Sequence, residues 1–311
     1  MSLFDLRLLI VSGKGGVGRS TLSAALALAA AQQGHRTCLA TLYGETAASR
    51  ALGLEDSQYS PRSVHPNLRV RNLTPVDCVA DFATRKIGVP AMAAPLLKRA
   101  PTRRFLELVP GLQDLVQLGK IEDMLCAPRP DDPPVDLCIL DAPATGHGLT
   151  LLTGARAMSD MTTSGPFYDL SIRIAEFLSD PHATGLCLVT LPELLPVQET
   201  LSFCHEVAQR GEPTRAILIN RVEDLSWTAN WEAPTTDPDT PVGQTLTRLH
   251  HEVTQRADRQ AVAITHLQEA LQVMTPRVTT ASVPRLSDSP TTASSLQPLA
   301  DALHASLAGT P

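Results

Sequence analysis

The run from Ser12 to Thr21 reads Ser-Gly-Lys-Gly-Gly-Val-Gly-Arg-Ser-Thr and is the part of this 311-residue chain best suited to chemistry. Its four glycines allow successive backbone N–H groups to turn toward one anion. The run follows the apolar, strand-like segment Leu6–Val11 and opens an alanine-rich helix predicted from Ser20 to about Gln33. The positive end of that helix dipole would face the same anion. The arrangement predicts a phosphate-binding loop, and therefore a nucleoside triphosphate ligand.

Within this loop the Ser20 hydroxyl is placed to ligate Mg²⁺, and the Thr21 hydroxyl can bond the α-phosphate. Arg19 stands where such a loop ordinarily has its phosphate lysine. A guanidinium stays charged but is bulkier than an ammonium, so we expect retained or weakened binding and poorer catalysis. Lys14 is a second departure, because an ordinary loop needs no lysine after its first glycine. The predicted phosphate-binding residues are Gly13, Lys14, Gly15, Gly16, Val17, Gly18, Arg19, Ser20 and Thr21.

A second candidate segment, Asp-Ala-Pro-Ala-Thr-Gly-His-Gly, begins at Asp141 and follows the apolar run Leu137–Leu140. A carboxylate at the carboxyl end of a parallel strand lies beside the phosphate loop in sheets of this type. Asp141 can hold a Mg²⁺-bound water, and Gly146 can bring a backbone N–H toward the γ-phosphate. Two readings stay open: Asp141 as a helix cap, and His147 as a residue that shapes the turn rather than sensing phosphate.

Strand-like and helical segments alternate along the chain, which predicts an α/β fold with a doubly wound, mostly parallel sheet. Several of the apolar runs lack polar alternation, as expected for strands covered on both faces. From about 76 to 128 the sequence reads as helices without strands, and about 153–180 continues this helical insertion. Residues about 225–243 predict a mobile loop. The predicted strands are Leu6–Val11, Thr37–Leu42, Leu137–Leu140, Gly185–Leu191, Ala216–Ile219 and Val278–Val283. We expect one domain over 1–311.

The segments GKGGVGRST and DAPATGHGL resemble those of the ArsA-type ATPases, the arsenite-pump and tail-anchored-protein-targeting family, in its bacterial anion-transporting-ATPase-like branch. The resemblance covers roughly residues 5–224 and 278–307. It implies a P-loop NTPase fold, ATP and Mg²⁺ as ligands, and the deviant P-loop of the MinD/ParA/ArsA group. In that group the lysine equivalent to Lys14 reaches across a face-to-face dimer to the partner's nucleotide.

The resemblance also implies contacts to the nucleotide base. Asn220 ends a strand where the family has an adenine-binding asparagine, although a simple turn residue remains an alternative. Pro284 and Arg285 lie where the family supplies backbone contacts to the base. The family's cysteine signatures are absent, since the six cysteines are scattered without a CxxC pair and are expected to be buried free thiols. Arsenite transport is therefore not favoured.

Switch I departs from the family as well. The family sequence S-T-D-P-A-H aligns with the segment from Thr41 to Thr46, which places Tyr43 where the family has its water-positioning aspartate. Glu45 is the nearest carboxylate, so Lys14, Glu45 and Asp141 are the catalytic candidates. The changes at Arg19 and Tyr43 favour a nucleotide-gated ATPase with weak or partner-dependent turnover. The alternative is a catalytically inactive, ATP-sensing adaptor or regulatory subunit of a paralogous ATPase.

Composition limits the partners. The formal net charge of −6 argues against nucleic acid as a ligand. No apolar run reaches the ~18 residues of a membrane span, and no leader pattern opens the chain, so we expect a cytoplasmic protein without stable membrane insertion. The resemblance implies a homo- or heterodimer through the nucleotide face. The helical insertion is the natural surface for a protein client.

Overall fold

The structure is a computed structural model. It describes residues 2–56, 58–89, 100–127, 132–144, 151, 154–155, 158–160, 163–211, 214–225, 240–274 and 278–308.

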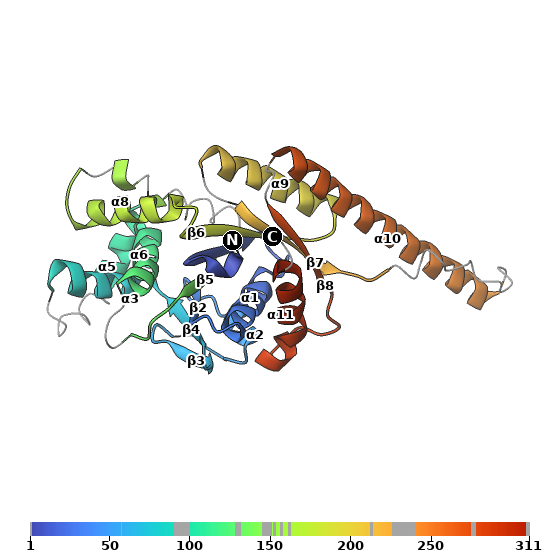
Figure 1. The fold of residues 1–311 in the computed structure, drawn as a ribbon, viewed down its shortest axis with the longest axis horizontal. Helices are drawn as coiled ribbons and strands as arrows, with labels where there is room; N and C mark the ends of the chain where they lie inside the picture. Colours follow the sequence, from blue (N-terminus) through green and yellow to red (C-terminus); the bar gives the residue numbers. More distant parts are fainter. Residues whose placement is uncertain are drawn as a thin grey trace.

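An eight-stranded sheet forms the centre of the molecule, in the order β3-β4-β2-β5-β1-β6-β7-β8 (Figure 1). Its strands are β1 (Leu8–Gly13), β2 (Thr37–Leu42), β3 (Arg62–His65), β4 (Leu68–Leu73), β5 (Leu137–Asp141), β6 (Thr184–Thr190), β7 (Thr214–Val222) and β8 (Thr279–Pro284). Every neighbouring pair is parallel except β3 with β4. The predicted α/β fold with a mostly parallel sheet is confirmed.

The central strand β1 shows why its sequence lacks polar alternation. All six of its residues are buried. Leu8 and Ile10 pack into one hydrophobic cluster, and Leu9 and Val11 pack into the other, so each face of the strand lies under helices. A parallel strand covered on both faces needs apolar residues at every position.

Helices cover the two faces of the sheet. One layer consists of α1 (Arg19–Gln32), α2 (Ala47–Ala51) and α11 (Ala293–Ala308). The opposite layer consists of α3 (Pro75–Phe82), α5 (Ala100–Leu108), α6 (Leu112–Cys126), α8 (Pro166–Ser179), α9 (Leu194–Gln209) and α10 (Pro241–Met274). Two short helical turns complete the described elements, η1 (Leu3–Asp5) and η2 (Ala83–Ile87). None of the described helices is long and apolar enough to cross a membrane.

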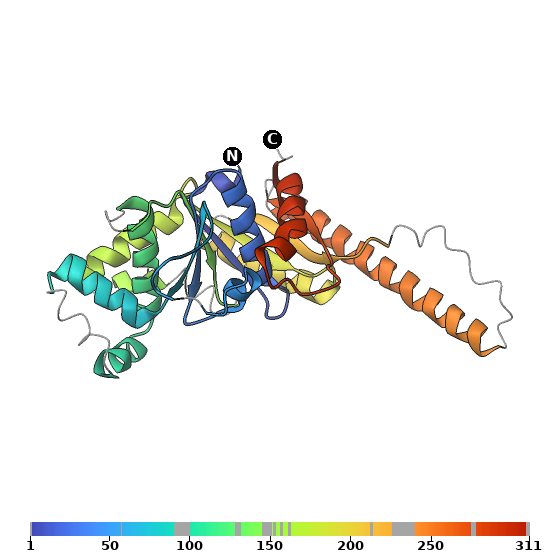
Figure 2. The same cartoon turned by 90° about the horizontal axis from the view of Figure 1, so that it is seen from below.

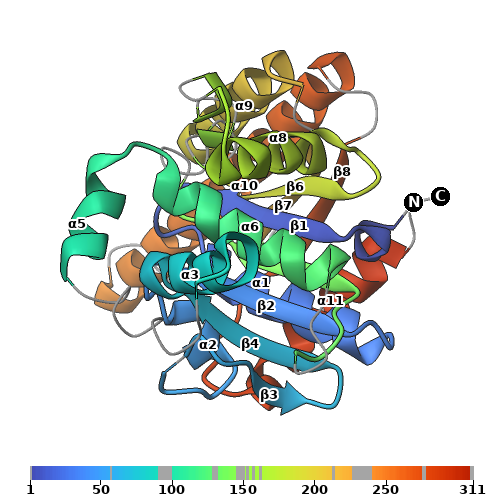
Figure 3. The same ribbon diagram turned by 90° about the vertical axis from the view of Figure 1, so that its left-hand side faces the viewer.

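The helices between β4 and β5 gather with α8 at one end of the molecule. Figure 3 views the molecule from this end, with α3, α5, α6 and α8 toward the reader. Contacts between α3 and α6 and between α6 and α8 join these helices into one group. The group contacts the sheet where α6 packs against β5 and α8 packs against β6, the two neighbours of β1.

The strands β3 and β4 were absent from the six apolar runs predicted from the sequence. β4 reads Leu-Arg-Val-Arg-Asn-Leu and carries two polar residues, Arg71 and Asn72, that are nevertheless buried. Buried polar side chains require partners that a sequence does not show. Arg71 donates to Asp132 at 2.8 Å, and Asn72 accepts from the Gly44 N–H at 3.1 Å. These contacts come from distant segments and make the polar strand possible.

Helix α10 is 34 residues long and leaves the body of the molecule. Its buried apolar residues Ala263, Leu267 and Leu271 lie in its C-terminal part, against α9. The part that begins at Pro241 projects away from the sheet in both views (Figures 1 and 2). The helix therefore has an anchored end beside the sheet and a projecting end.

Candidate functional site

The Gly-rich loop leaves β1 at Gly13 and enters α1 at Arg19. Gly18 caps the helix with a φ of 90°, in the left-handed region that favours glycine. A Cβ at this position would collide with the Nδ2 of Asn220. The loop therefore depends on glycine here for two reasons, its backbone conformation and the side chain that lies against it.

Asn220, near the end of β7, contacts the loop through its side chain. Its Nδ2 donates to the Val17 carbonyl at 2.7 Å, and its Oδ1 accepts from the Arg221 N–H at 2.9 Å. The side chain is buried, so both hydrogen bonds are needed to offset its desolvation. The structure thus gives Asn220 a contact with the phosphate loop, in addition to its place in the wall of the cavity described below.

Asp141 ends β5, paired with Val11 in the strand that leads into the loop. Its side chain is fully buried. The Ser23 hydroxyl donates to its Oδ1 at 3.2 Å, and the Arg19 Nε lies 3.3 Å from the same oxygen. Burial raises the pKa of Asp141, while the Ser20 and Ser23 hydroxyls and the Arg19 guanidinium act in the opposite direction.

The Arg19 side chain turns toward this carboxylate and is only 12% exposed. Its guanidinium also donates to the Gly13 carbonyl at 3.3 Å and lies 3.8 Å from a Glu45 carboxylate oxygen. Burial and the negative charge of Asp141 raise the pKa of Glu45, and Arg19 lowers it. The Arg19 guanidinium is thus surrounded by hydrogen-bond acceptors from β1, β5 and the segment after β2.

Ser20 and Asp141, the residues predicted to bind Mg²⁺, have suitable side chains for that ion. A serine hydroxyl and a carboxylate are the hard oxygen ligands that Mg²⁺ prefers. Asp141 Oδ2 is buried and has no hydrogen-bond partner among the described residues, which leaves one carboxylate oxygen available. The other oxygen, Oδ1, is the one bound by Arg19 and Ser23. Ser20 and Asp141 are the residues that would hold the ion.

Lys14 points away from this carboxylate, toward α9. Its Nζ lies 2.6 Å from Glu199 Oε1, and the two side chains are 55% and 34% exposed. An ion pair in water at this degree of exposure contributes little to stability. The lysine that is predicted to act across a dimer is therefore held weakly, on the outer face of its own chain.

In the segment after β2, Tyr43 stands where the family has its water-positioning aspartate. Its φ of 56° is unusual for a bulky residue. Its hydroxyl donates to Asp114 Oδ1 on α6, and burial followed by this carboxylate raises the pKa of Tyr43. Tyr43 thus joins the segment after β2 to the helical group. Glu45, two residues later, is the carboxylate that faces the phosphate loop.

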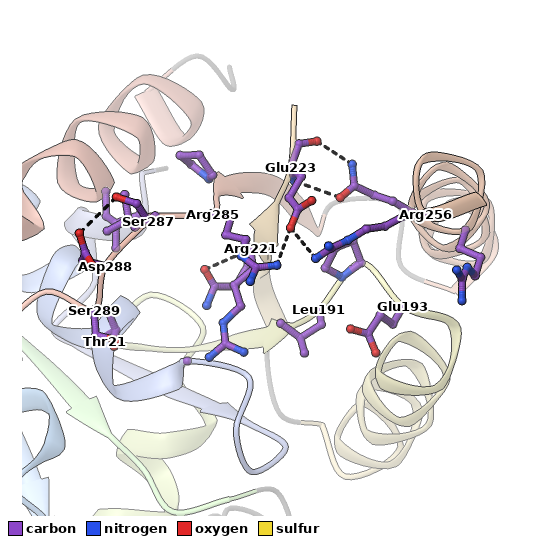
Figure 4. Close-up of a pocket in the computed structure, with 18 of the residues that line it drawn as sticks. Thr21, Leu191, Glu193, Arg221, Glu223, Arg256, Arg285, Ser287, Asp288 and Ser289 are labelled. Carbon is purple, nitrogen blue, oxygen red and sulfur yellow. Dashed lines mark hydrogen bonds and ion pairs between the residues drawn. The ribbon is translucent and has the colours of Figure 1, made fainter. Parts of the chain in front are cut away.

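A cavity of about 860 Å³ opens beside the loop, at the carboxyl ends of β6, β7 and β8. Gly18 and Thr21 of the loop and of α1 line it together with Pro284 and Arg285. This is the position expected for the nucleoside in an open α/β sheet. Figure 4 shows side chains around this cavity from α1, β7 and α10 and from the segments that follow β6, β7 and β8.

A charged cluster at the rim of the cavity was not expected from the sequence. Glu223 Oε1 binds both Arg256 and Arg285, and Gln260 exchanges two hydrogen bonds with the Glu223 backbone, at 3.0 and 2.8 Å (Figure 4). These ion pairs and hydrogen bonds attach α10 to the ends of β7 and β8. No local pattern indicates this cluster, since Arg256 and Arg285 lie 33 and 62 residues along the chain from Glu223.

The described structure brings most of the predicted site residues together around the end of β1. The exceptions are Lys14, which lies at the outer face, and Gly146, which together with His147 falls outside the described residues. Gly15 and Gly16 are exposed on the loop, and Val17 is buried beneath it.

The sheet order and the Gly-rich loop between β1 and α1 define the class of the P-loop NTPases. A family model described as anion-transporting ATPase matches residues 6–166. The chain therefore belongs to the anion-transporting, ArsA-type ATPase family. The predicted family is confirmed.

Similarity to individual proteins supports the same family membership. The chain is 32% identical over 228 residues to ATPase BagA of Mycobacterium tuberculosis, across 70% of this chain and 66% of that protein. It is 26% identical over 246 residues to an arsenical pump-driving ATPase of Escherichia coli, across 73% of this chain and 36% of the pump ATPase. The matches thus cover just under two thirds of the mycobacterial relative and about a third of the pump ATPase.

Proposed function

We propose that this chain is an ATP-binding member of the family that works as a nucleotide-gated dimer and hydrolyses ATP slowly. The observation that carries the proposal is the continuity between the phosphate loop and the cavity, which share Gly18 and Thr21. Phosphates on the loop and a nucleoside in the cavity would lie along one path. Mg²⁺, when bound by Ser20 and Asp141, would supply charge to the β- and γ-phosphates.

The remaining roles follow from position. Glu45 is the carboxylate nearest to Tyr43 in the sequence and lies 3.8 Å from the Arg19 guanidinium, so it is the candidate for orienting water. Lys14 is the candidate for contact with a partner's nucleotide. The outer face that carries Lys14 is the proposed dimer surface. The helical insertion of about 76–128 and 153–180 is the proposed client surface, within a single domain of 1–311.

Slow turnover is supported by two features of the site. The Arg19 guanidinium is already engaged by Asp141 and by the Gly13 carbonyl. Tyr43 occupies the place of the family's aspartate and is bound to Asp114. Phosphoryl transfer depends on positioned charge, so both features reduce catalysis. The same features support the alternative, a catalytically inactive ATP-sensing adaptor.

Single-turnover hydrolysis, with the protein in excess over ATP and Mg²⁺, tests the proposal. We expect bound ATP to be cleaved slowly, and we expect Asp141→Asn to bind ATP without cleaving it. Arg248→Lys, on the projecting part of α10, is the matched surface control. Bound ATP that persists uncleaved in the wild type would favour the adaptor. Failure to bind ATP at all would overturn the proposal.

A further inference from the structure

The Arg19 guanidinium occupies the position from which a cation would neutralise Asp141. Its Nε lies 3.3 Å from Asp141 Oδ1, and its two terminal nitrogens face the Gly13 carbonyl and Glu45. The side chain is 12% exposed and the carboxylate 0%. This is a nearly buried ion pair with acceptors on several sides.

Such a pair is difficult to share with a metal ion. A buried carboxylate needs a compensating charge, and a guanidinium, which is weakly hydrated and planar, provides it well. Mg²⁺ demands near-octahedral geometry and gives up its water reluctantly. Two cations on one carboxylate in a water-poor site also repel each other strongly.

We propose that Arg19 competes with Mg²⁺ for Asp141, so that this chain binds a nucleoside triphosphate without requiring the metal. This inference rests on the proposed function, because it concerns the same phosphate loop. In this state Arg19 neutralises Asp141, and the backbone N–H groups of the loop, with the N-terminus of α1, bind the phosphates. Oδ2 of Asp141 has no partner among the described residues, so the competition is one of charge: Mg²⁺ binds this carboxylate strongly only when the guanidinium moves away from Oδ1.

A lysine at this position would behave differently. Its ammonium is a compact point charge without a nitrogen equivalent to Nε, so it cannot bridge Asp141, Gly13 and Glu45 in the same way. Arg19→Lys therefore frees Asp141 for the metal. Nucleotide binding by this variant should then depend on Mg²⁺.

The test is the equilibrium binding of a fluorescent ATP analogue, followed by anisotropy in EDTA and in excess Mg²⁺. We expect the wild-type Kd to change less than about threefold between the two buffers, and the Arg19→Lys Kd to tighten by about tenfold or more with Mg²⁺, since one charge-assisted hydrogen bond accounts for a change of that order. Arg248→Lys is the matched control, because it makes the same substitution at a side chain that is 72% exposed and remote from the loop. The control should follow the wild type.

A second readout reports the metal itself. In the presence of the analogue, free Mn²⁺ measured by electron paramagnetic resonance should fall much more with Arg19→Lys than with the wild type. Wild-type binding that needs Mg²⁺ as strongly as the lysine variant does would overturn the competition while leaving the nucleotide site intact. Absence of binding in both buffers would overturn the nucleotide site and this inference with it. The wild-type measurement is decisive even if a variant fails to fold.

Discussion

At the scale of single residues, the site is defined by a few side chains whose hydrogen bonds are already made within the chain. Asn220 supports the Val17 carbonyl, and Arg19 neutralises Asp141. The loop is thus held by contacts that do not need a ligand. A prearranged loop lowers the entropy that ligand binding would otherwise cost.

The dependence of this loop on Gly18 can be measured. Gly18→Ala should lower the free energy of unfolding by about 1–3 kcal/mol, because alanine at φ 90° is strained and its Cβ collides with Asn220. Gly15→Ala is the matched control, since Gly15 has no neighbouring atom within 4 Å of an added Cβ and lies outside the left-handed region. Chemical denaturation without nucleotide should show a change within about 0.5 kcal/mol for the control. Equal effects of the two substitutions would contradict this role of Gly18.

At the scale of elements, buried ion pairs join the helical group to the sheet. Arg71 on β4 donates to Asp132 at 2.8 Å and to the Tyr59 carbonyl at 2.8 Å. Lys120 on α6 reaches Asp132 at 3.3 Å and Asp81 on α3 at 3.1 Å. Burial alone would raise the pKa of Asp132, but the hydrogen bond and charge of Arg71 hold it below its ordinary value.

Removing one partner of this network should be costly. Arg71→Met should destabilise the fold by about 2–4 kcal/mol, because Asp132, a mostly covered carboxylate, then keeps only Lys120 as a cationic partner. Arg69→Met is the matched control, on the same strand and partly exposed. Urea unfolding at pH 7 measures both changes, and we expect the control to lose less than about 1 kcal/mol.

The same pair of proteins should differ in pH dependence. The folded pKa of Asp132 is lowered, so its contribution to stability is present above the unfolded value of about 4 and is lost as pH falls below it. The gap in unfolding free energy between wild type and Arg71→Met should therefore narrow below about pH 4. A gap that stays constant with falling pH would assign the loss to packing instead of charge.

At the scale of the whole molecule, two other parts of the chain are joined to the loop and cavity by different side-chain contacts: the helical group and helix α10. The helical group is tied to the site through Tyr43 and Asp114, and α10 is clipped to it through Glu223. A ligand in the cavity would contact Arg256 and Gln260 of α10. Nucleotide occupancy can thus bias both parts, which is what a gated dimer requires.

The proposed dimer makes a prediction about Lys14, which Glu199 holds on its own chain. Glu199→Gln should raise the association constant of the dimer formed with a non-hydrolysable ATP analogue by up to about fivefold, since exposed ion pairs contribute about 0.2–1 kcal/mol. Sedimentation velocity measures the dimer fraction. Glu206→Gln, which affects an exposed ion pair later on α9, is the control and should leave it unchanged. A dimer weakened by Glu199→Gln would show that this glutamate serves the interface itself.

By itself, the sequence determined the class of the fold and the places of β1 and β5, each within two residues of the observed ends. These features are local: apolar runs buried on both faces, a glycine-rich turn before a helix, and a carboxylate directly after a strand. Each of these patterns involves only residues that are close together in the sequence, so it can be recognised from the sequence alone. The family follows from the same segments.

Only the tertiary structure decided what the side chains of these segments bind. Arg19 and Asp141 are 122 residues apart, and Val17 and Asn220 are 203 apart. The polar strand β4 likewise depends on Asp132, and the attachment of α10 through Glu223 depends on Arg285, directly after β8. The direction of a charged side chain is set by which acceptors packing brings within about 3 Å, and that depends on the whole sheet. For this reason the position of Arg19 was readable from the sequence, but its engagement with Asp141 was not.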